Sequence, residues 1–233
     1  MSSDGLRDAY ERRAEEQYAE PWTFDPRERK FARVWSLLER QLPCDAFLDA
    51  GCGDGRYLAA LARARGAARI VGTDISERIL ATARAAAAPF EPELARANLE
   101  SLPFGDAEFD LVLCSQVVEH LLDVDAGLGE LARVLRPNGA LILTTDNARN
   151  FVTRALYLGR LRRQAGFDFP HRDFEVDDLE RRIRASGLEL VRAETFRFSA
   201  PRGFGQGLLD RLDALLPRHG VGDIIALVAR RHG

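Results

Sequence analysis

The chain has 233 residues, of which 46% are hydrophobic and 30% charged, and its formal net charge at neutral pH is −3. With only 19 glycines and 10 prolines it reads as one globular domain, and a collagenous or disordered chain is excluded. A nearly balanced charge gives no overall field that would favour nucleic acid or an anionic membrane surface, so neither is expected as a partner.

The three cysteines, Cys44, Cys52 and Cys114, indicate a reducing compartment. Their number is odd and no Cys-x-x-Cys pair occurs, so we expect neither a disulfide framework nor a cysteine zinc site. The first residues lack the apolar stretch of a signal peptide, and no apolar run approaches the ~18 residues of a membrane helix. We therefore expect a cytoplasmic protein without stable membrane insertion.

Residues 1–42 predict an N-terminal helical arm or cap. The stretch 1–26 is polar and charged with scattered aromatic side chains, which favours a helical arm. From 27 to 42 apolar residues recur at spacings of three and four, and this spacing predicts an amphipathic helix that ends at Pro43.

Residues 43–146 alternate between short apolar runs and helical segments. The predicted strands cover 46–50, 69–74, 94–98, 109–114 and 140–145, and the predicted helices cover 55–65, 76–88 and 124–135. This alternation indicates βαβ units and a doubly wound, mostly parallel sheet with helices on both faces.

The remainder of the chain predicts a lid followed by a hairpin. Residues 147–175, basic and helical over 148–165, form a lid insertion. Residues 176–233 add a helix at 176–186, a strand at 188–198, a short helix at 207–216 and a strand at 223–231. We place the last strand antiparallel, in a hairpin with 188–198. The predicted α/β sheet then has seven strands, and the whole chain, 1–233, forms a single domain.

The sharpest motif is the glycine-rich turn Leu48-Asp-Ala-Gly-Cys-Gly-Asp-Gly-Arg56 between a predicted strand and a predicted helix. Glycines let the backbone approach a ligand closely, and the start of a helix offers free N–H groups. The spacing is G-x-G-x-G, whereas the dinucleotide fingerprint is G-x-G-x-x-G. A tight turn that needs glycine for steric reasons alone is the alternative interpretation.

Asp74 strengthens the ligand interpretation. It ends the second predicted strand, close to the ~20-residue offset from the glycine turn at which an acid binds ribose hydroxyls. A carboxylate accepts two hydrogen bonds at once, which suits the 2′ and 3′ hydroxyls; the alternative is an acid beside a helix N-cap. Together the turn and the acid predict an adenosine ligand at the carboxyl ends of the strands.

Five motifs follow one another in the chain. They are Leu48–Leu58, Val71-Gly-Thr-Asp-Ile-Ser76, Asn98-Leu-Glu-Ser-Leu-Pro-Phe104, Phe109-Asp-Leu-Val-Leu-Cys-Ser-Gln-Val-Val-Glu-His120 and Leu135-Arg-Pro-Asn-Gly-Ala-Leu141. In this order they resemble class I S-adenosylmethionine-dependent methyltransferases, in the small-molecule branch that includes ubiquinone-biosynthesis O-methyltransferases. The resemblance implies a Rossmann-like seven-stranded fold with helical lid insertions, S-adenosyl-L-methionine as cofactor and methyl transfer as the activity.

The resemblance also assigns residues to the cofactor. Its methionine moiety would lie along Gly51-Cys52-Gly53 with Asp49 near the ammonium group. Asp74 would hold the ribose, and Ile75 would pack on the adenine.

Three further residues complete the expected cofactor site. Asn98 stands where the family usually has aspartate; its carbonyl oxygen can accept a hydrogen bond from the adenine amino group without charge assistance, so we expect somewhat weaker binding. Leu99 would supply a backbone N–H to the ring, and Ser115 a contact after the fourth strand.

Two histidines are candidate bases for removing a proton from a hydroxyl acceptor. His120 follows the fourth strand, and the alternative is that it is a structural histidine that caps a helix. His171 lies before the predicted helix at 176–186, and the alternative is that it is an exposed loop histidine. Glu119 and His120 match the end of Glu-x-x-Glu-His, which resembles a divalent-metal site in some ubiquinone O-methyltransferases. Gln116 replaces the first carboxylate, so we expect no metal there.

The expected reaction is methyl transfer to a small-molecule acceptor, most simply at a hydroxyl oxygen. The arginine-rich run 149–163 is either a solvated helix face or a contact for an anionic acceptor. The aromatic side chains of 1–35 and the segment 148–170 are expected to form the lid, whose apolar side chains favour a partly apolar acceptor. Transfer to nitrogen or carbon, a catalytically silent binding module and a nicotinamide-dependent oxidoreductase are the alternatives. The oligomeric state stays open.

Overall fold

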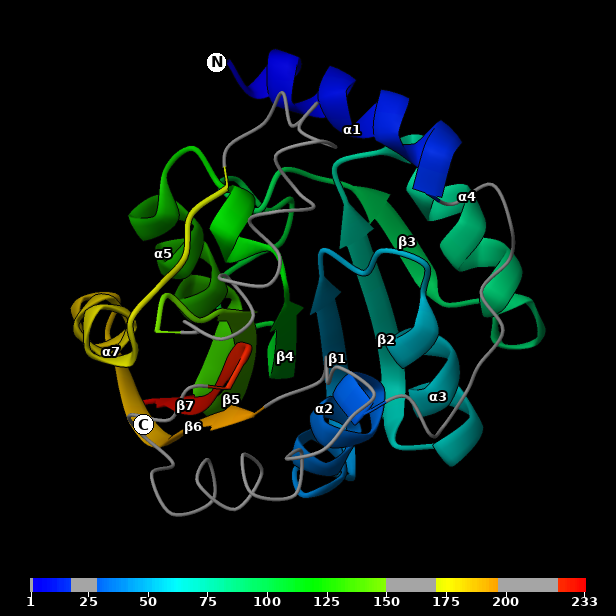
Figure 1. Cartoon of the computed structure of the whole chain (residues 1–233). Helices are drawn as coiled ribbons and strands as arrows, with labels where there is room; N and C mark the ends of the chain where they lie inside the picture. Colours follow the sequence, from blue (N-terminus) through cyan, green and yellow to red (C-terminus); the bar gives the residue numbers. More distant parts are fainter. Residues whose placement is uncertain (1, 18–28, 150–170, 197–221) are drawn as a thin grey trace, which may run out of the picture.

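The computed structural model describes residues 2–17, 29–149, 171–196 and 222–233. These residues form one seven-stranded sheet in the order β3-β2-β1-β4-β5-β7-β6 (Figure 1). Every neighbouring pair is parallel except those of β7, which runs antiparallel to β5 and β6. The strands are β1 (Cys44–Ala50), β2 (Ala67–Asp74), β3 (Glu93–Arg96), β4 (Phe109–Ser115), β5 (Leu135–Asp146), β6 (Leu188–Phe196) and β7 (Ile224–Arg231).

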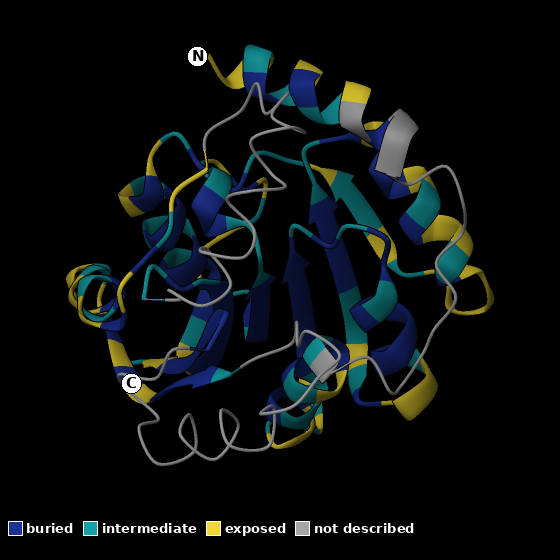
Figure 2. Ribbon diagram, in the orientation of Figure 1, coloured by how far each residue is buried: buried dark blue, intermediate teal, exposed yellow. Residues whose placement is uncertain are grey.

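Helices cover both faces of this sheet, as the βαβ alternation predicts. On one face α2 (Arg29–Glu39), α3 (Arg56–Ala64) and α4 (Glu77–Ala86) pack their apolar side chains on the strands. On the other face α5 (Val124–Val134) and α7 (Val176–Ala185) do the same. The central strands between these layers are buried (Figure 2). The fold is therefore a Rossmann-like, doubly wound α/β sheet with one antiparallel strand.

The helix boundaries follow local signals in the sequence. The apolar face of α2 buries Phe31, Val34 and Leu38, three of the residues whose spacing predicted the helix. The hydroxyl of Ser76 accepts a hydrogen bond from the N–H of Ile79 at 3.2 Å, which makes Ser76 the N-cap of α4, at the predicted start of this helix. Two 3₁₀ helices, η1 (Ala88–Phe90) and η2 (Val118–His120), follow α4 and β4.

The start of β5 differs from the prediction. The sequence predicted a helix to residue 135 and a strand from residue 140, but β5 begins at Leu135, which pairs with Phe109 of β4. The ladder shifts register before Leu111, and the Arg136 guanidinium pairs with the Asp110 carboxylate at 3.0 Å across the irregularity. Residues 136–139 thus form a bulge within β5, because pairing with β4 holds both Leu135 and Ala140 in the sheet.

The helix α1 (Ser3–Gln17) is the described part of the predicted N-terminal arm. It lies across the carboxyl ends of the strands, beside α4 (Figure 1). The predicted helices at 148–165 and 207–216 and the remainder of the arm lie outside the described residues, and the single-domain division with its lid at 147–175 stays a prediction. No helix among the described residues is long and apolar enough to cross a membrane.

Candidate active site

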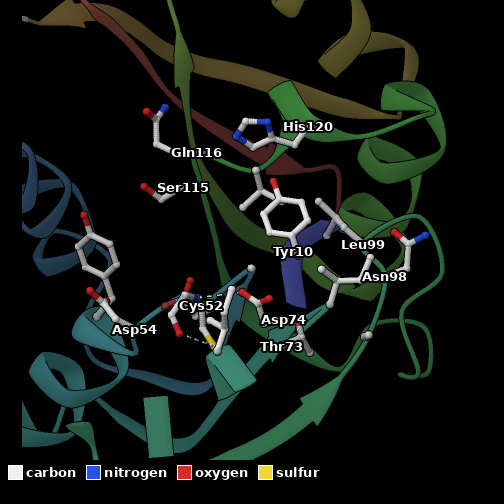
Figure 3. Close-up of a pocket in the computed structure, with 18 of the residues that line it drawn as sticks. Tyr10, Cys52, Asp54, Thr73, Asp74, Asn98, Leu99, Ser115, Gln116 and His120 are labelled. Atoms are coloured by element: carbon white, nitrogen blue, oxygen red, sulfur yellow. Dashed lines mark hydrogen bonds between the residues drawn. The ribbon is translucent and has the colours of Figure 1, made fainter. Parts of the chain in front are cut away.

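A cavity of about 370 Å³ opens at the carboxyl ends of β1, β2 and β4, within the size range of small-molecule sites (Figure 3). Every residue predicted to bind the cofactor lines it, and so does His120. The predicted members are Asp49, Gly51, Cys52, Gly53, Asp74, Ile75, Asn98, Leu99, Ser115 and His120.

The glycine-rich turn connects β1 to α3 along one wall of the cavity. Its first two N–H groups, from Gly51 and Cys52, both donate to the carbonyl oxygen of Thr73 at 2.8 and 2.7 Å. Gly51 has φ +84°, and a Cβ atom there would collide with the side chain of Val117 on the opposite wall. Glycine is thus needed for the turn and for the close approach of the two walls.

Asp49 lies near the end of β1, beside this turn, and is buried with only 1% of its surface exposed. None of the described residues gives a hydrogen bond to its Oδ2 atom. Burial raises the pKa of Asp49 well above its usual value, and the charges of Asp54 and Asp74 raise it further, whereas Arg56 opposes them. A cation bound in the cavity would satisfy this oxygen and stabilise the ionised form.

Asp74 ends β2 and faces the glycine turn. Its Oδ2 atom accepts from the N–H of Gly53 at 3.2 Å, and its Oδ1 atom accepts from the N–H of Ser76 at 3.0 Å. Burial raises the pKa of Asp74 to about 6, although the N–H groups of Ser76, Gly53 and Ile75 lower it. The carboxylate therefore ties together the loops that follow β1 and β2 and still lines the cavity.

The loop after β3 forms another wall. The side-chain carbonyl oxygen of Asn98 accepts from the N–H of Glu100 at 3.0 Å, so part of its hydrogen-bonding capacity already shapes the loop. The carboxylate of Glu100 in turn accepts from the N–H of Leu122 at 2.7 Å, which fixes this loop to the one after η2. Leu99 is 6% exposed and lines the cavity between them.

The wall after β4 carries polar groups on the side away from the glycine turn. The hydroxyls of Ser115 and Thr144 are hydrogen-bonded to each other at 2.9 Å. Gln116, which the sequence singled out only as a missing metal ligand, has the left-handed φ of +60° and lines the cavity. Its Nε2 atom is buried and finds no acceptor among the described residues.

The N-terminal segments add groups that sequence reasoning did not assign to the site. Leu6 and Tyr10 of α1 and Lys30 of α2 line the cavity, and the rings of Tyr10 and His120 meet edge to face with centroids 6.0 Å apart. The labelled side chains in Figure 3 place Tyr10 between His120 and the glycine-turn side of the cavity. The carboxylate of Glu11 accepts from the N–H of Glu77 at 2.8 Å and so fixes α1 to the start of α4. The aromatic content of the arm was the available signal.

His171 lies beside His120 but is not among the residues that line the cavity. Its ring centroid is 5.2 Å from that of His120, and its Nε2 atom is 3.4 Å from Asp146 and 3.7 Å from Asp173. The two carboxylates raise the pKa of His171 to about 10.

Glu119 is the buried carboxyl group behind this wall. It is 1% exposed, and its Oε2 atom accepts from the hydroxyl of Thr145 at 2.9 Å. Burial and the charge of Asp146 raise the pKa of Glu119 to about 7, whereas the hydrogen bond from Thr145 and the charge of Lys30 lower it.

Comparison with known proteins identifies the family. The family model "Methyltransferase domain" matches residues 48–143. A "probable S-adenosylmethionine-dependent methyltransferase" of Mycolicibacterium smegmatis is 35% identical over 203 residues, which cover 87% of this chain and 70% of that protein. This chain belongs to the S-adenosylmethionine-dependent methyltransferases. Its cofactor is therefore S-adenosylmethionine.

This methyltransferase is also similar to two further proteins. A ubiquinone biosynthesis O-methyltransferase of Azoarcus is 32% identical over 156 residues, covering 62% of this chain and 64% of that protein. The fold matches that of magnesium protoporphyrin IX methyltransferase from Synechocystis, solved with bound SAH, at a TM-score of 0.67 and 18% identity. This alignment covers 99% of this chain and 100% of the other.

Proposed function

We propose that this methyltransferase transfers the methyl group of S-adenosylmethionine to a hydroxyl oxygen of a small-molecule acceptor bound between the glycine turn and His120. The observation that supports the cofactor's place in the cavity is the buried Asp49 carboxylate, whose Oδ2 atom has no hydrogen-bond donor among the described residues. The amino-acid part of the cofactor carries an ammonium group, which fits this orphaned oxygen. Gly51, Cys52 and Gly53 line the same cavity beside Asp49, so the amino-acid part of the cofactor would lie along this turn.

The other cofactor contacts follow from the geometry of the cavity. Asp74 would accept hydrogen bonds from the ribose hydroxyls, since each of its oxygens has a lone pair beyond those used by Gly53 and Ser76. Ile75 would pack on the adenine. In the next loop, Asn98 would accept from the adenine amino group with its remaining lone pair, and the N–H of Leu99 would reach the ring.

The remaining cofactor contact comes from the wall after β4. Ser115 lines the cavity, and its hydroxyl, which is hydrogen-bonded to that of Thr144, would contact the cofactor.

Methyl transfer mainly requires that the protein positions the cofactor and the acceptor correctly. When bound, S-adenosylmethionine supplies an activated methyl group on its sulfonium, and displacement depends on distance and alignment with the acceptor atom. The described residues contribute walls that hold both reactants, with Tyr10 of α1 covering the cavity.

His120 is our proposed base for the acceptor hydroxyl, because its imidazole lines the cavity. His171 is not retained in this role. Its pKa of about 10 keeps the imidazole protonated near neutral pH, so neither ring nitrogen has a lone pair that could accept the proton of the acceptor.

The groups around His120 favour an acceptor that presents oxygen atoms. Gln116 has a buried Nε2 donor with no acceptor among the described residues, and Lys30 places a positive charge in the same cavity. An acceptor oxygen, neutral or anionic, would pair with both. Of the arginine-rich run, Arg149 is paired with Glu175 at 2.9 Å, and 150–163 lies outside the described residues.

The test is turnover. A screen of cell metabolites with isotopically labelled methyl donor should give a labelled ether or ester, identified by mass spectrometry. A labelled amine or carbon centre would move the acceptor atom to nitrogen or carbon. Binding of S-adenosylhomocysteine without any labelled product would favour a silent binding module, and calorimetric binding of NAD in its place would favour an oxidoreductase.

A further inference from the structure

Three side chains meet just outside the cavity, on the far side of His120. Asp146 is the last residue of β5, and His171 and Asp173 lie in the segment that precedes α7. One ligand atom from each lies within 4.8 Å of the other two. Each is partly open to solvent, with side-chain exposures of 33%, 41% and 26% in that order.

In the cation-free chain the two carboxylates pair with the protonated His171 ring, but the geometry of this pairing is loose. Both carboxylates approach the same ring nitrogen, Nε2 of His171, which carries at most one proton. The separations of 3.4 and 3.7 Å exceed the usual N–H···O range of roughly 2.7–3.2 Å. They match the edge of a tetrahedron around a cation with bonds of about 2.0–2.2 Å, which is roughly 3.4 Å.

The backbone holds the three side chains in this arrangement. The N–H of Phe174 donates to the carbonyl of Asp146 at 3.1 Å, and the N–H of Ala148 donates to the carbonyl of Phe174 at 2.8 Å. The N–H of Arg172 donates to the carbonyl of Glu119 at 3.0 Å. Phe174 itself is buried, so the segment between His171 and Asp173 is fixed to the end of β5 and to η2. A preorganised ligand set is what a metal site needs.

The charges of the neighbourhood also favour a cation. Asp146 and Asp173 each bring a carboxylate, and the charge of Asp146 acts on the buried Glu119 behind it. The positive charge of Lys30 acts on Glu119 in the opposite sense. One imidazole with two carboxylates is a borderline donor set that suits Zn²⁺ and Mn²⁺ better than Ca²⁺.

We propose that Asp146, His171 and Asp173 form a binding site for a divalent transition-metal cation, with water completing its coordination. This site differs from the Glu-x-x-Glu-His motif, whose first position is Gln116 here, since none of its three ligands belongs to that motif. The cation would lie beside His120, because the rings of His120 and His171 are 5.2 Å apart.

The test is a titration of the untagged, chelator-treated chain with Mn²⁺, in which the electron paramagnetic resonance signal of free Mn²⁺ is measured. No cofactor or acceptor is present, so the outcome is independent of the proposed function. We expect one Mn²⁺ per chain, displaced by Zn²⁺, which binds such donor sets more tightly. Asp146→Asn, Asp173→Asn and His171→Gln should each weaken binding at least about tenfold.

Asp177→Asn is the matched control, because Asp177 is an exposed acid in the first turn of α7 and the substitution removes the same charge. It should bind Mn²⁺ as the unaltered chain does. Circular dichroism should show that each variant is folded. The proposal is overturned if the unaltered chain binds no Mn²⁺ beyond background. It is equally overturned if the ligand variants bind as Asp177→Asn does, or if only His120→Gln abolishes binding.

Discussion

The imidazole rings of His120 and His171 lie 5.2 Å apart, yet they occupy different environments. His120 lines the cavity beside Tyr10, whereas His171 lies between the carboxylates of Asp146 and Asp173. Because those carboxylates hold His171 protonated in the metal-free chain, the two histidines cannot share one role. The proposed division is a base at His120 and a cation ligand at His171.

Replacing His120 by alanine should lower kcat for a hydroxyl acceptor by about 10²–10⁴, the usual contribution of a positioned base. The Kd for S-adenosylhomocysteine should stay within about twofold, because His120 lies away from the proposed cofactor contacts. Steady-state kinetics and calorimetry measure the two quantities, and added imidazole should restore part of the lost kcat.

His232→Gln is the control for this experiment, since that side chain is 70% exposed near the chain end. It should behave as the unaltered enzyme. If His120→Ala retains full kcat, the acceptor loses its proton without help from this residue and the base assignment fails.

Asp49→Asn should weaken cofactor binding but raise the stability of the ligand-free protein. The Kd for S-adenosylhomocysteine should rise at least about tenfold, because a charge-assisted hydrogen bond to the ammonium is lost. Without ligand, the same substitution should raise Tm at pH 7, since the folded state disfavours the buried carboxylate. The gain exists above the ordinary carboxyl pKa and disappears below it, where the group is protonated in both folded and unfolded chains.

Asp45→Asn, at an exposed position on the same strand, removes one charge without entering the cavity. It should leave the Kd unchanged. Equal effects of the two substitutions on S-adenosylhomocysteine binding would contradict the role of Asp49.

Cofactor affinity should fall as the pH is lowered through about 6, the pKa of Asp74. Above that pH the carboxylate accepts from the ribose hydroxyls; below it the protonated group loses part of this capacity, so the Kd rises by up to about tenfold per unit. The neighbouring groups are the N–H groups of Gly53, Ile75 and Ser76 and the carboxylates of Asp49 and Glu11.

Asp74→Asn isolates this contribution, because the other groups remain. The variant should bind S-adenosylhomocysteine more weakly at pH 8 and show a flatter dependence between pH 7 and 5 by calorimetry. An identical slope in the two proteins would assign the titration to another group.

Gln116→Ala should raise KM for the acceptor several-fold and leave cofactor Kd unchanged. The reason is that its Nε2 donor has no acceptor among the described residues and faces the acceptor side of the cavity in our proposal. Kinetics at saturating S-adenosylmethionine test this directly. A rise in cofactor Kd with an unchanged acceptor KM would instead place Gln116 against the cofactor.

Much of the fold was predictable because its signals are local. The N-cap at Ser76, the apolar spacing of α2 and the glycine turn each act within a few residues. The antiparallel hairpin of β6 and β7 also agrees with prediction. The start of β5 was missed, because pairing with β4 overrides the turn preference of 136–139.

The acceptor side of the site was less accessible to sequence reasoning. Tyr10 and Lys30 reach the cavity from helices that precede the sheet, and the aromatic content of the arm was the one signal, which pointed to Tyr10 but not to Lys30. The cluster of Asp146, His171 and Asp173 depends on backbone pairing between the end of β5 and the segment before α7. Such tertiary contacts leave no periodic pattern in the chain.

A crystal structure with S-adenosylhomocysteine tests the central claim most directly. We predict its ammonium group within hydrogen-bonding distance of the Asp49 carboxylate and its ribose hydroxyls on Asp74. A ligand bound elsewhere, or one whose amino-acid moiety points away from the turn at 51–53, would contradict the account.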